Sequence, residues 1–345
     1  MNGADSTVLY GAPHSPAQGG KDIQDFPPFS GGRLSLGLWL DDEQTFAIEA
    51  SGFLLERRGA GYQARGDSNG NPIFGIPVYN SVPYQIGATT IMLGEDSLPF
   101  SLPDDPNRFR DGAGVIVGGI VIANHLQLWG ADATGVVRIF RADSWQVAGL
   151  IGFRYLDLSE SFDLTSDMRG TSDTFEGMSG VVTETFRTRN QFFGGSLGLR
   201  TRYALDRLAF DFTGRVALGV NHEVQSVWGG FYSYNHTGPY ASGPQGVFAQ
   251  PANEGRRAGN KFAVVPEAEF KVNYALTSWM RLSIGYNFLY CNNVLRPGDQ
   301  INRSVPKGQT FNQADGSISA TSPAPLFNTT SFFAHGATLG LDFRY

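Results

Sequence analysis

The sequence predicts an all-β protein, an antiparallel transmembrane β-barrel of about ten strands with long extracellular loops. Three observations predict this class: the alternation in the last residues, its recurrence along the chain, and the alternating length of the connections. The final eleven residues carry small or polar side chains at every second position, and between them stand Ala337, Leu339, Leu341, Phe343 and Tyr345. A strand with this period has one apolar and one polar face, as it would between lipid and a polar interior.

The end of the chain carries a second signal in the same residues. Leu339, Leu341, Phe343 and Tyr345 finish the sequence on a Phe-x-aromatic motif. Such an ending resembles the closing strand and assembly signal of bacterial outer-membrane barrels. It implies the outer-membrane barrel assembly machinery as a partner.

Composition excludes several other classes. The 345 residues contain no run of about 18 apolar residues, so the chain is not a helical membrane protein. The 44 glycines and 13% aromatic residues suit a barrel, in which glycine lets strands bend and aromatics line the membrane interfaces. A net charge of -6 gives no electrostatic support for a nucleic-acid partner. The single cysteine, Cys291, excludes an internal disulfide framework.

In the first half of the chain the alternation predicts two hairpins. The first joins strands at 33–40 and 45–54, and the second joins strands at 129–139 and 145–155. Each hairpin has a polar turn of about four residues. The apolar faces hold aliphatic and aromatic side chains, and the opposite faces hold mostly glycine, serine, threonine and charged residues.

The second half repeats the arrangement with two more hairpins and a closing strand. Pro266 lacks a backbone donor, so we expect either a local bulge there or a strand that starts later. The predicted strands lie at 193–203, 208–220, 262–274, 280–290 and 336–345.

The connections between these nine strands alternate in length. Short turns alternate with long polar stretches near residues 56–112, 157–190, 222–261 and 291–331. Outer-membrane barrels have this rhythm, because their periplasmic turns are short and their extracellular loops are long. We expect one barrel domain at 31–345 after a polar N-terminal segment at 1–30.

The direction of the strands predicts one strand more than the nine visible ones. With the C-terminus in the periplasm, the strand at 33–40 descends and needs an ascending strand before it. Residues 1–30 show neither such a strand nor a secretion signal, so we expect both to lie upstream of this sequence. The closing strand should then pair with the strand at 280–290 on one side only. Nine strands and the missing one give ten, and a hairpin hidden at 72–95 would give twelve.

Five segments resemble a known family. They lie at 29–40, 152–158, 265–267, 285–290 and 296–301, the last reading Arg296-Pro297-Gly298-Asp299-Gln300-Ile301. These segments resemble the beta-barrel porin type 7 family of planctomycete bacteria, and the resemblance covers about residues 6–345. It implies an outer-membrane barrel more strongly than it implies transport.

The polar faces of the strands carry charges of both signs that would point into the lumen. In a barrel of about ten strands side chains nearly fill the interior. The charges therefore either pair and plug the lumen or line a narrow pore whose selectivity they set. An excess of arginine would favour anions in an open path. The inward charged residues are Asp132, Arg138, Arg154, Arg200, Arg202, Asp211, Arg215, Glu267, Glu269, Lys271, Arg281, Asp342 and Arg344.

The sequence gives little support for catalysis or metal binding. Neighbours in a strand point to opposite faces, the histidines lack metal-ligand spacing, and no phosphate-binding or nucleotide motif occurs. We therefore expect no enzyme, no cofactor and no metal. The candidates for acid–base or nucleophilic chemistry stand at two strand ends, with His222 and Glu223 at one and Asp157, Ser159 and Glu160 at the other.

A surface role is the second hypothesis. The stretch 224–257 is rich in aromatics among glycine, asparagine and serine, a composition also used by adaptable binding surfaces. We favour packing of these aromatics over the barrel mouth. The functional hypothesis is an outer-membrane porin for small polar or anionic solutes, embedded in the lipid bilayer. The alternative is a non-conducting structural or surface-adhesion barrel that acts through its loops. The aromatics are Trp228, Phe231, Tyr232, Tyr234, Tyr240 and Phe248.

Overall fold

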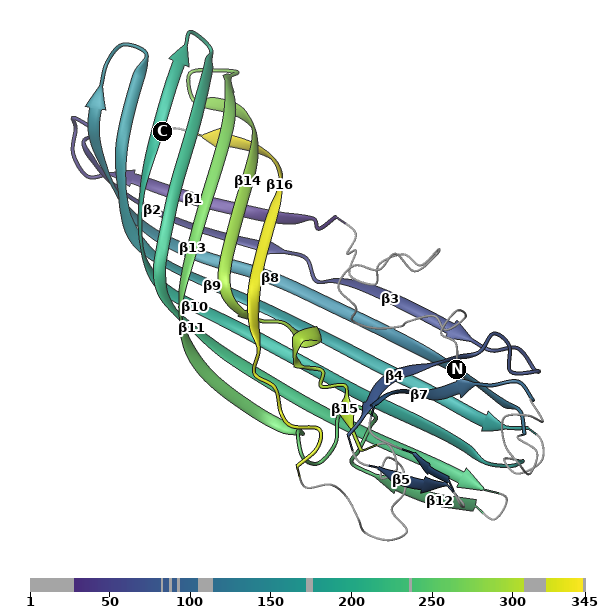
Figure 1. Cartoon of the computed structure of the whole chain (residues 1–345). Coiled ribbons are helices and arrows are strands. Elements are labelled where there is room, and N and C mark those ends of the chain that lie inside the picture. Colours follow the sequence, from purple (N-terminus) through teal and green to yellow (C-terminus); the bar gives the residue numbers. More distant parts are fainter. Residues whose placement is uncertain are drawn as a thin grey trace.

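One large antiparallel sheet and two small sheets make up the fold in Figure 1, a computed structural model that describes residues 28–81, 83–86, 89–91, 94–104, 114–171, 176–235, 238–306 and 321–343. The large sheet has the order β1-β2-β8-β9-β10-β11-β13-β14-β16. These are the nine strands that the alternation predicts, in the predicted order. The all-β class is confirmed. The bounds are β1 (Gly31–Trp39), β2 (Phe46–Leu55), β8 (Ile116–Arg141), β9 (Trp145–Gly170), β10 (Ser179–Leu205), β11 (Leu208–Asn235), β13 (Gly255–Ala275), β14 (Met280–Leu295) and β16 (Thr329–Phe343).

The two ends of this sheet are β1 and β16, and no pairing joins them within the described residues. Figure 1 shows the sheet twisted and curled, with β1 and β2 passing behind β13, β14 and β16. Ion pairs from Arg33 of β1 to Glu267 and Glu269 of β13 show that these strands face one another across the interior. The sheet therefore curls around an inner space.

The closing strand pairs as the sequence predicts on one side. β16 runs antiparallel to β14, with Leu341 opposite Leu282 and Leu339 opposite Ile284. Leu339, Leu341 and Phe343 are exposed on its outer face, whereas Tyr345 lies outside the described residues.

The tight turns lie where the sequence predicts them. Between β1 and β2 the Asp41 carboxylate accepts backbone N–H groups of Thr45 and Phe46 at 2.8 and 2.7 Å. Between β10 and β11 Asp206 adopts a φ of 47°, a conformation that aspartate tolerates in turns. Between β13 and β14 the Thr277 hydroxyl accepts the N–H of Met280 at 3.0 Å.

The long strands show that two of the predicted loops are wrong. The strands β8, β9, β10 and β11 contain 26, 26, 27 and 28 residues. β9 continues to Gly170 and β10 begins at Ser179, so most of the predicted loop 157–190 is paired strand. The predicted loop 222–261 likewise lies largely in β11 and β13.

The error has a physical cause: the polar and apolar faces of the strand exchange sides partway along it. Beyond Tyr155 the outward positions of β9 become polar, beginning with Asp157 and Ser159. The inward positions become apolar, and Phe162 and Leu164 are buried. This part of the strand has the pattern of a water-soluble sheet, which a search for lipid-facing strands misses.

The small sheets belong to the residues between β2 and β8 and to the segment after β14. A short strand β3 (Arg58–Arg65) extends the pairing of β2 along β8. The hairpin predicted at 72–95 exists as β4 (Phe74–Asn80) and β7 (Gly94–Ser101). It pairs with β15 (Ser304–Val305) in a separate sheet, so it adds no strand to the large sheet.

The remaining elements are short. A 3-10 helix, η2 (Pro297–Gln300), follows β14. Strands β5 (Tyr84–Ile86) and β6 (Thr89–Ile91) pair with each other, and β12 (Gly238–Gly243) pairs with β11. The described part of the chain contains no helix long and apolar enough to cross a membrane.

Pro266 does not cause the predicted bulge on the β11 side, where it pairs in register with Val216. Its effect lies on the β14 side. The N–H of Val264 donates to the Asn292 side chain on β14 at 2.7 Å, and Pro266, two residues on, points its donor-less nitrogen the same way. Pairing with β14 begins only at Glu267, as expected for a strand pair that starts later.

Candidate functional site

The outer face of the large sheet carries an apolar band of limited height. On β9 the outward residues from Trp145 to Tyr155 are apolar or glycine, and Ile151 and Phe153 are 60% and 50% exposed. At about 3.3 Å per residue and a tilt of about 45°, this stretch rises roughly 23 Å. Membrane barrels have an apolar band about 25 Å tall, so this face has the dimensions of a lipid-facing surface.

Aromatic rings border the band at both edges. The edge of the band nearer to β4 and β15 is called the upper edge, although it faces the lower part of Figure 1. There the rings of Trp129, Tyr155 and Phe193 form a row with centroids 5.0 and 4.9 Å apart. Membrane barrels carry such belts where the headgroups begin. At the lower edge the ring pairs are Trp145 with Tyr203 and Trp279 with Phe343.

Most charged residues named for the lumen lie on the inner face of this band. Asp132, Arg154 and Glu267 are buried, and Asp342 is exposed. Arg344 lies outside the described residues. The partly buried members are Arg200, Arg202, Asp211, Arg215, Glu269, Lys271 and Arg281.

Arg154 is the centre of a buried ion cluster. It is 1% exposed, and its Nε donates to Asp132 Oδ1 at 2.6 Å. Its Nη2 donates to Asp132 Oδ2 at 3.3 Å and also to Glu267 Oε2. Asp132 lies on the neighbouring strand β8 and Glu267 on β13, so one guanidinium joins two walls of the inner space. Buried charges are retained when they are paired and hydrogen-bonded in this way.

Three further cations complete the cluster. Arg215 Nη2 lies 3.0 Å from Glu267 Oε2. Arg33 lies 3.5 Å from Glu267 Oε1 and 3.1 Å from Glu269 Oε1, and Lys271 Nζ lies 3.1 Å from Glu269 Oε2. The charges of the cluster therefore largely neutralise one another, which is the arrangement expected of a plug.

A second pair crosses the interior nearer the lower edge. Arg200 of β10 forms two parallel hydrogen bonds to the Glu49 carboxylate of β2, at 2.7 and 2.8 Å. Glu49 and Arg33 were not among the residues named for the lumen. The alternation places both on the inner faces of their strands, so the signal was present in the sequence.

The charges at the lower mouth are less tightly paired. Arg202 Nη1 lies 3.7 Å from Asp211 Oδ2, and Arg281 Nη1 is buried without a hydrogen-bond partner among the described residues. Arg138 lies at the lower rim, at the β1–β2 turn. Its Nη1 donates to the Glu43 carbonyl in the β1–β2 turn at 3.0 Å, and its guanidinium lies over the Trp39 ring. The register of β8 with β9 shifts between Arg138 and Phe140, close to the end of the strand.

Above the ion cluster the interior is filled by a lumen apolar layer. Cys291 belongs to this layer and is buried. The layer leaves a cavity of about 20 Å³, room for about one water molecule. Its members are Leu126, Leu128, Leu156, Leu158, Phe192, Ala217, Ala263, Val265, Leu289, Cys291, Val294 and Phe332.

The chain after Cys291 turns inward and is held there by two asparagines. Asn190 Oδ1 accepts the N–H of Leu295 at 2.8 Å, and Asn190 Nδ2 donates to the Leu295 carbonyl at 2.9 Å. Asn221 Nδ2 donates to the carbonyl of Asn293 at 2.7 Å. The side chains thus satisfy backbone groups of β14 beyond Leu289, where its pairing with β13 ends.

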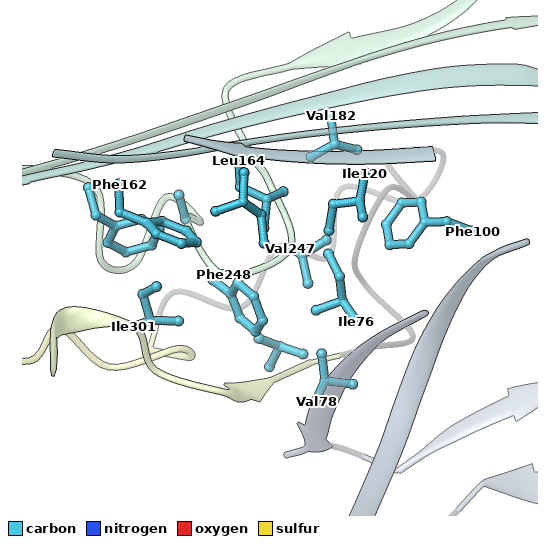
Figure 2. Packing of buried hydrophobic residues seen from close by; sticks show 14 of the residues in the cluster. Ile76, Val78, Phe100, Ile120, Phe162, Leu164, Val182, Val247, Phe248 and Ile301 are labelled. Atoms are coloured by element: carbon cyan, nitrogen blue, oxygen red, sulfur yellow. The ribbon is translucent and has the colours of Figure 1, made fainter. Parts of the chain in front are cut away.

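A second apolar cluster, the upper plug, fills the interior farther from the band (Figure 2). Phe162, Leu164 and Val182 project into it from the large sheet, and Ile76 projects from β4. Val247 and Phe248 come from a connection between β12 and β13 that is buried throughout residues 245–250.

Glu184 fixes this buried connection. Its Oε1 accepts the backbone N–H groups of Phe248 and Ala249, each at 2.6 Å. A side chain at Gly246 would place its Cβ 2.3 Å from the same oxygen, so only glycine allows this approach. Burial raises the pKa of the Glu184 carboxyl to about 7.

The aromatics of residues 224–257 do not share one role. Phe231 and Phe248 are buried in the upper plug, as predicted for packing over the mouth. Trp228, Tyr232 and Tyr234 are instead exposed on the outer face of β11. The side chain of Tyr240 lies outside the described set.

The candidates for acid–base chemistry are not brought together. His222 contacts Asn260 on the outer face, whereas its neighbour Glu223 is fully buried. Glu160 points inward to Arg296, and Asp157 is bound by Arg189 on the outer face. In the part of the chain that the structure describes, no group of three histidine, cysteine or acidic residues could hold a metal ion.

Comparison with known proteins agrees with the apolar band and the antiparallel sheet. No curated protein matches the chain. The sequence model of the family described as Putative beta barrel porin-7 (BBP7) matches residues 4–345, nearly the whole chain. The resemblance seen in the five sequence segments is thereby confirmed, and the chain belongs to this β-barrel porin family.

Proposed function

We propose that this chain is an outer-membrane β-barrel protein of a bacterial envelope, a porin-family protein for small polar or anionic solutes whose lumen is closed at rest. The observation that carries the proposal is the filling of the interior at three levels: the ion cluster around Arg154, the lumen apolar layer and the upper plug. The proposed outer-membrane position is supported by the family and by the apolar band with its two aromatic belts.

Each level opposes solute passage for a different reason. At the ion cluster a solute would have to separate Arg154 from Asp132 and Glu267, which leaves buried charges without partners. At the apolar layer a polar solute would lose its hydration without gaining hydrogen bonds. Constitutive conduction is therefore not expected, and solute passage requires movement of the inward-folded segments.

The solute class follows from the lower mouth. Arg281 and Arg202 lie there, and the Arg281 Nη1 group lacks a partner in the described structure. A guanidinium nitrogen without a hydrogen-bond partner in a narrow mouth favours the approach of an anion. Small anions and small polar molecules are thus the solutes proposed for an opened lumen, with no enzymatic step.

A ten-stranded closed barrel is part of this proposal. The edges of β1 and β16 would be costly in lipid, because each unsatisfied backbone group there costs several kcal/mol. One strand between them would satisfy both edges and give an even number of strands.

Conductance in a planar bilayer tests the closed lumen. Wild-type protein is expected to insert without stable conductance steps. Arg154→Ser with Arg200→Ser, which removes two guanidinium groups from the interior, is expected to stay silent because the apolar layer remains. Phe192→Ala with Phe332→Ala, which thins that layer, is expected to stay silent because the ion cluster remains. All four substitutions together are expected to give stable conductance steps.

Two results would contradict the proposal. Stable steps from the wild type would mean that the lumen is open. Conductance steps from Arg154→Ser with Arg200→Ser that are as large as those of the fourfold variant would mean that the apolar layer is no barrier. Heat-modifiable electrophoretic migration serves as the folding control for every variant.

A second candidate function is surface interaction. It is favoured by Trp228, Tyr232 and Tyr234, which are exposed to solvent beyond the apolar band instead of packing over the mouth. Exposed apolar side chains that form a contiguous patch mark interaction sites.

A further inference from the structure

The outer face beyond the apolar band is not uniform in charge. On β10, β11 and β13 the outward residues past the upper aromatic belt include Arg187, Arg189 and Arg256, and no carboxylate occurs among those described. The adjacent strand β9 carries Asp157 and Asp163 on the same face. A basic strip thus runs along three strands, bordered by an acidic strand.

Two of these arginines are available to a ligand. Arg189 binds Asp157 through three hydrogen bonds of 2.6 to 3.2 Å. Arg187 and Arg256 are exposed and form no ion pair among the described residues. They flank Ser226 in one row of the sheet, because Arg187 pairs with Ser226 on one side and Arg256 pairs with it on the other.

An aromatic patch begins one row above these arginines. Trp228, 54% exposed, follows Ser226 on the outer face of β11, and Tyr232 and Tyr234 follow farther out at 40% and 45%. The two tyrosine rings meet edge to face with centroids 4.6 Å apart. Aromatic faces with polar groups around them suit the flat, partly apolar faces of sugar rings.

The heights of these groups relative to the band match a membrane glycolipid. Arg187 stands six residues before Phe193 of the upper belt on β10. At about 3.3 Å per residue and a tilt of about 45° it lies roughly 14 Å above that belt, and Trp228 lies one row beyond it. Proceeding outward from the lipid, the surface presents first hydrocarbon, then guanidinium groups, then aromatic rings.

We propose that the strip formed by Arg187, Arg256, Trp228 and Tyr232 binds lipopolysaccharide of the outer leaflet, with the arginines on its phosphates and the aromatics on its sugars. Guanidinium groups bind phosphate through parallel charge-assisted hydrogen bonds, and lipid recognition at a membrane surface uses such basic clusters. The proposal rests on the outer-membrane position proposed above. It commits to the glycolipid because one surface offers partners for acyl chains, phosphates and sugars in that order.

Titration of purified lipopolysaccharide onto the detergent-solubilised, folded full chain tests this. Arg187→Gln with Arg256→Gln is expected to weaken binding by roughly tenfold or more, because two charge-assisted contacts are lost. Trp228→Ser with Tyr232→Ser is expected to weaken binding to a smaller extent. The matched control is Arg169→Gln, an exposed outward arginine on the acidic strand β9, which is expected to leave binding unchanged.

Three further arms distinguish other occupants. Lipopolysaccharide stripped of its phosphates is expected to bind wild type as weakly as the intact glycolipid binds the double glutamine variant. Equal binding with and without the phosphates would overturn the proposal, and so would equal weakening by Arg169→Gln. Inorganic phosphate binding as tightly as the glycolipid would point to an isolated phosphate site instead. A change in oligomeric state of the glutamine variant without glycolipid would assign the strip to a second copy.

Failure of the proposed function gives a different signature. A chain that fractionates away from the outer membrane, or lacks heat-modifiable folding, contradicts the outer-membrane barrel itself. A folded outer-membrane barrel that ignores lipopolysaccharide contradicts only the binding strip.

Discussion

Replacing Arg154 by leucine is expected to lower the free energy of unfolding by about 3–5 kcal/mol, because it leaves buried carboxylates without their central partner. Arg154 is the most deeply buried charge of the ion cluster and binds both Asp132 and Glu267. Equilibrium unfolding by urea in detergent micelles or lipid vesicles measures the change. Arg215 and Arg33 remain near Glu267, so Asp132 loses the larger share of its stabilisation.

The matched control for Arg154 is an exposed ion pair in the same chain. Arg58 and Glu56 are both more than one-third exposed in their side chains, with a separation of 2.7 Å. Arg58→Leu is expected to cost at most about 1 kcal/mol. A loss of less than about 1 kcal/mol from Arg154→Leu as well would show that the cluster does not hold the walls of the sheet together.

An arginine placed on the outer face of β11 is expected to destabilise the fold at one height and to have little effect at another. Val216→Arg lies within the apolar band and should cost about 2–4 kcal/mol, the penalty for arginine near the bilayer midplane. Val224→Arg lies eight residues farther along the same face, beyond the band, and should change stability by no more than about 0.5 kcal/mol. Ile284→Arg on β14, 59% exposed in the band, should behave like Val216→Arg.

This pair of variants locates the membrane independently of the family. Both positions are valines on one strand, so strand propensity and side-chain size cancel between them. Equal costs for the two arginines in lipid vesicles would mean that the band does not face lipid.

The nine strands of the large sheet could be predicted because apolar and polar residues alternate along each of them within the apolar band. The sequence alone predicts β14, without information about its neighbouring strands, from its outward residues Leu282, Ile284, Tyr286 and Phe288. The turn residues are equally local, since Asp41 and Thr277 satisfy backbone donors within a few residues.

The upper half of the strands was missed because its burial depends on distant parts of the chain. In the sequence, Phe162 and Leu164 fall in a stretch with the pattern of a loop. Their burial becomes clear only in the structure, where β4 and residues 245–250 fill the space opposite them. The same holds for Glu184, whose partners at Phe248 and Ala249 lie more than sixty residues away. Alternation shows which face a residue takes, but it does not show what occupies that face.

The ion pairs between these charges could likewise not be predicted from the sequence. Arg154 and Glu267 could be assigned inward, but their contact depends on how the sheet curls. Glu49 was passed over in favour of later charges although it binds Arg200.

The most direct test of a closed lumen uses the chain's own cysteine. Cys291 is buried in the lumen apolar layer, beside a cavity of about 20 Å³. We expect a small water-soluble methanethiosulfonate reagent, added to both sides of vesicles that hold the folded wild type, to leave Cys291 unmodified for hours while it labels the urea-unfolded chain within minutes. Phe192→Ala with Phe332→Ala, combined with Arg154→Ser and Arg200→Ser, should make it reactive in the folded state. Rapid labelling of folded wild-type protein would contradict the closed lumen.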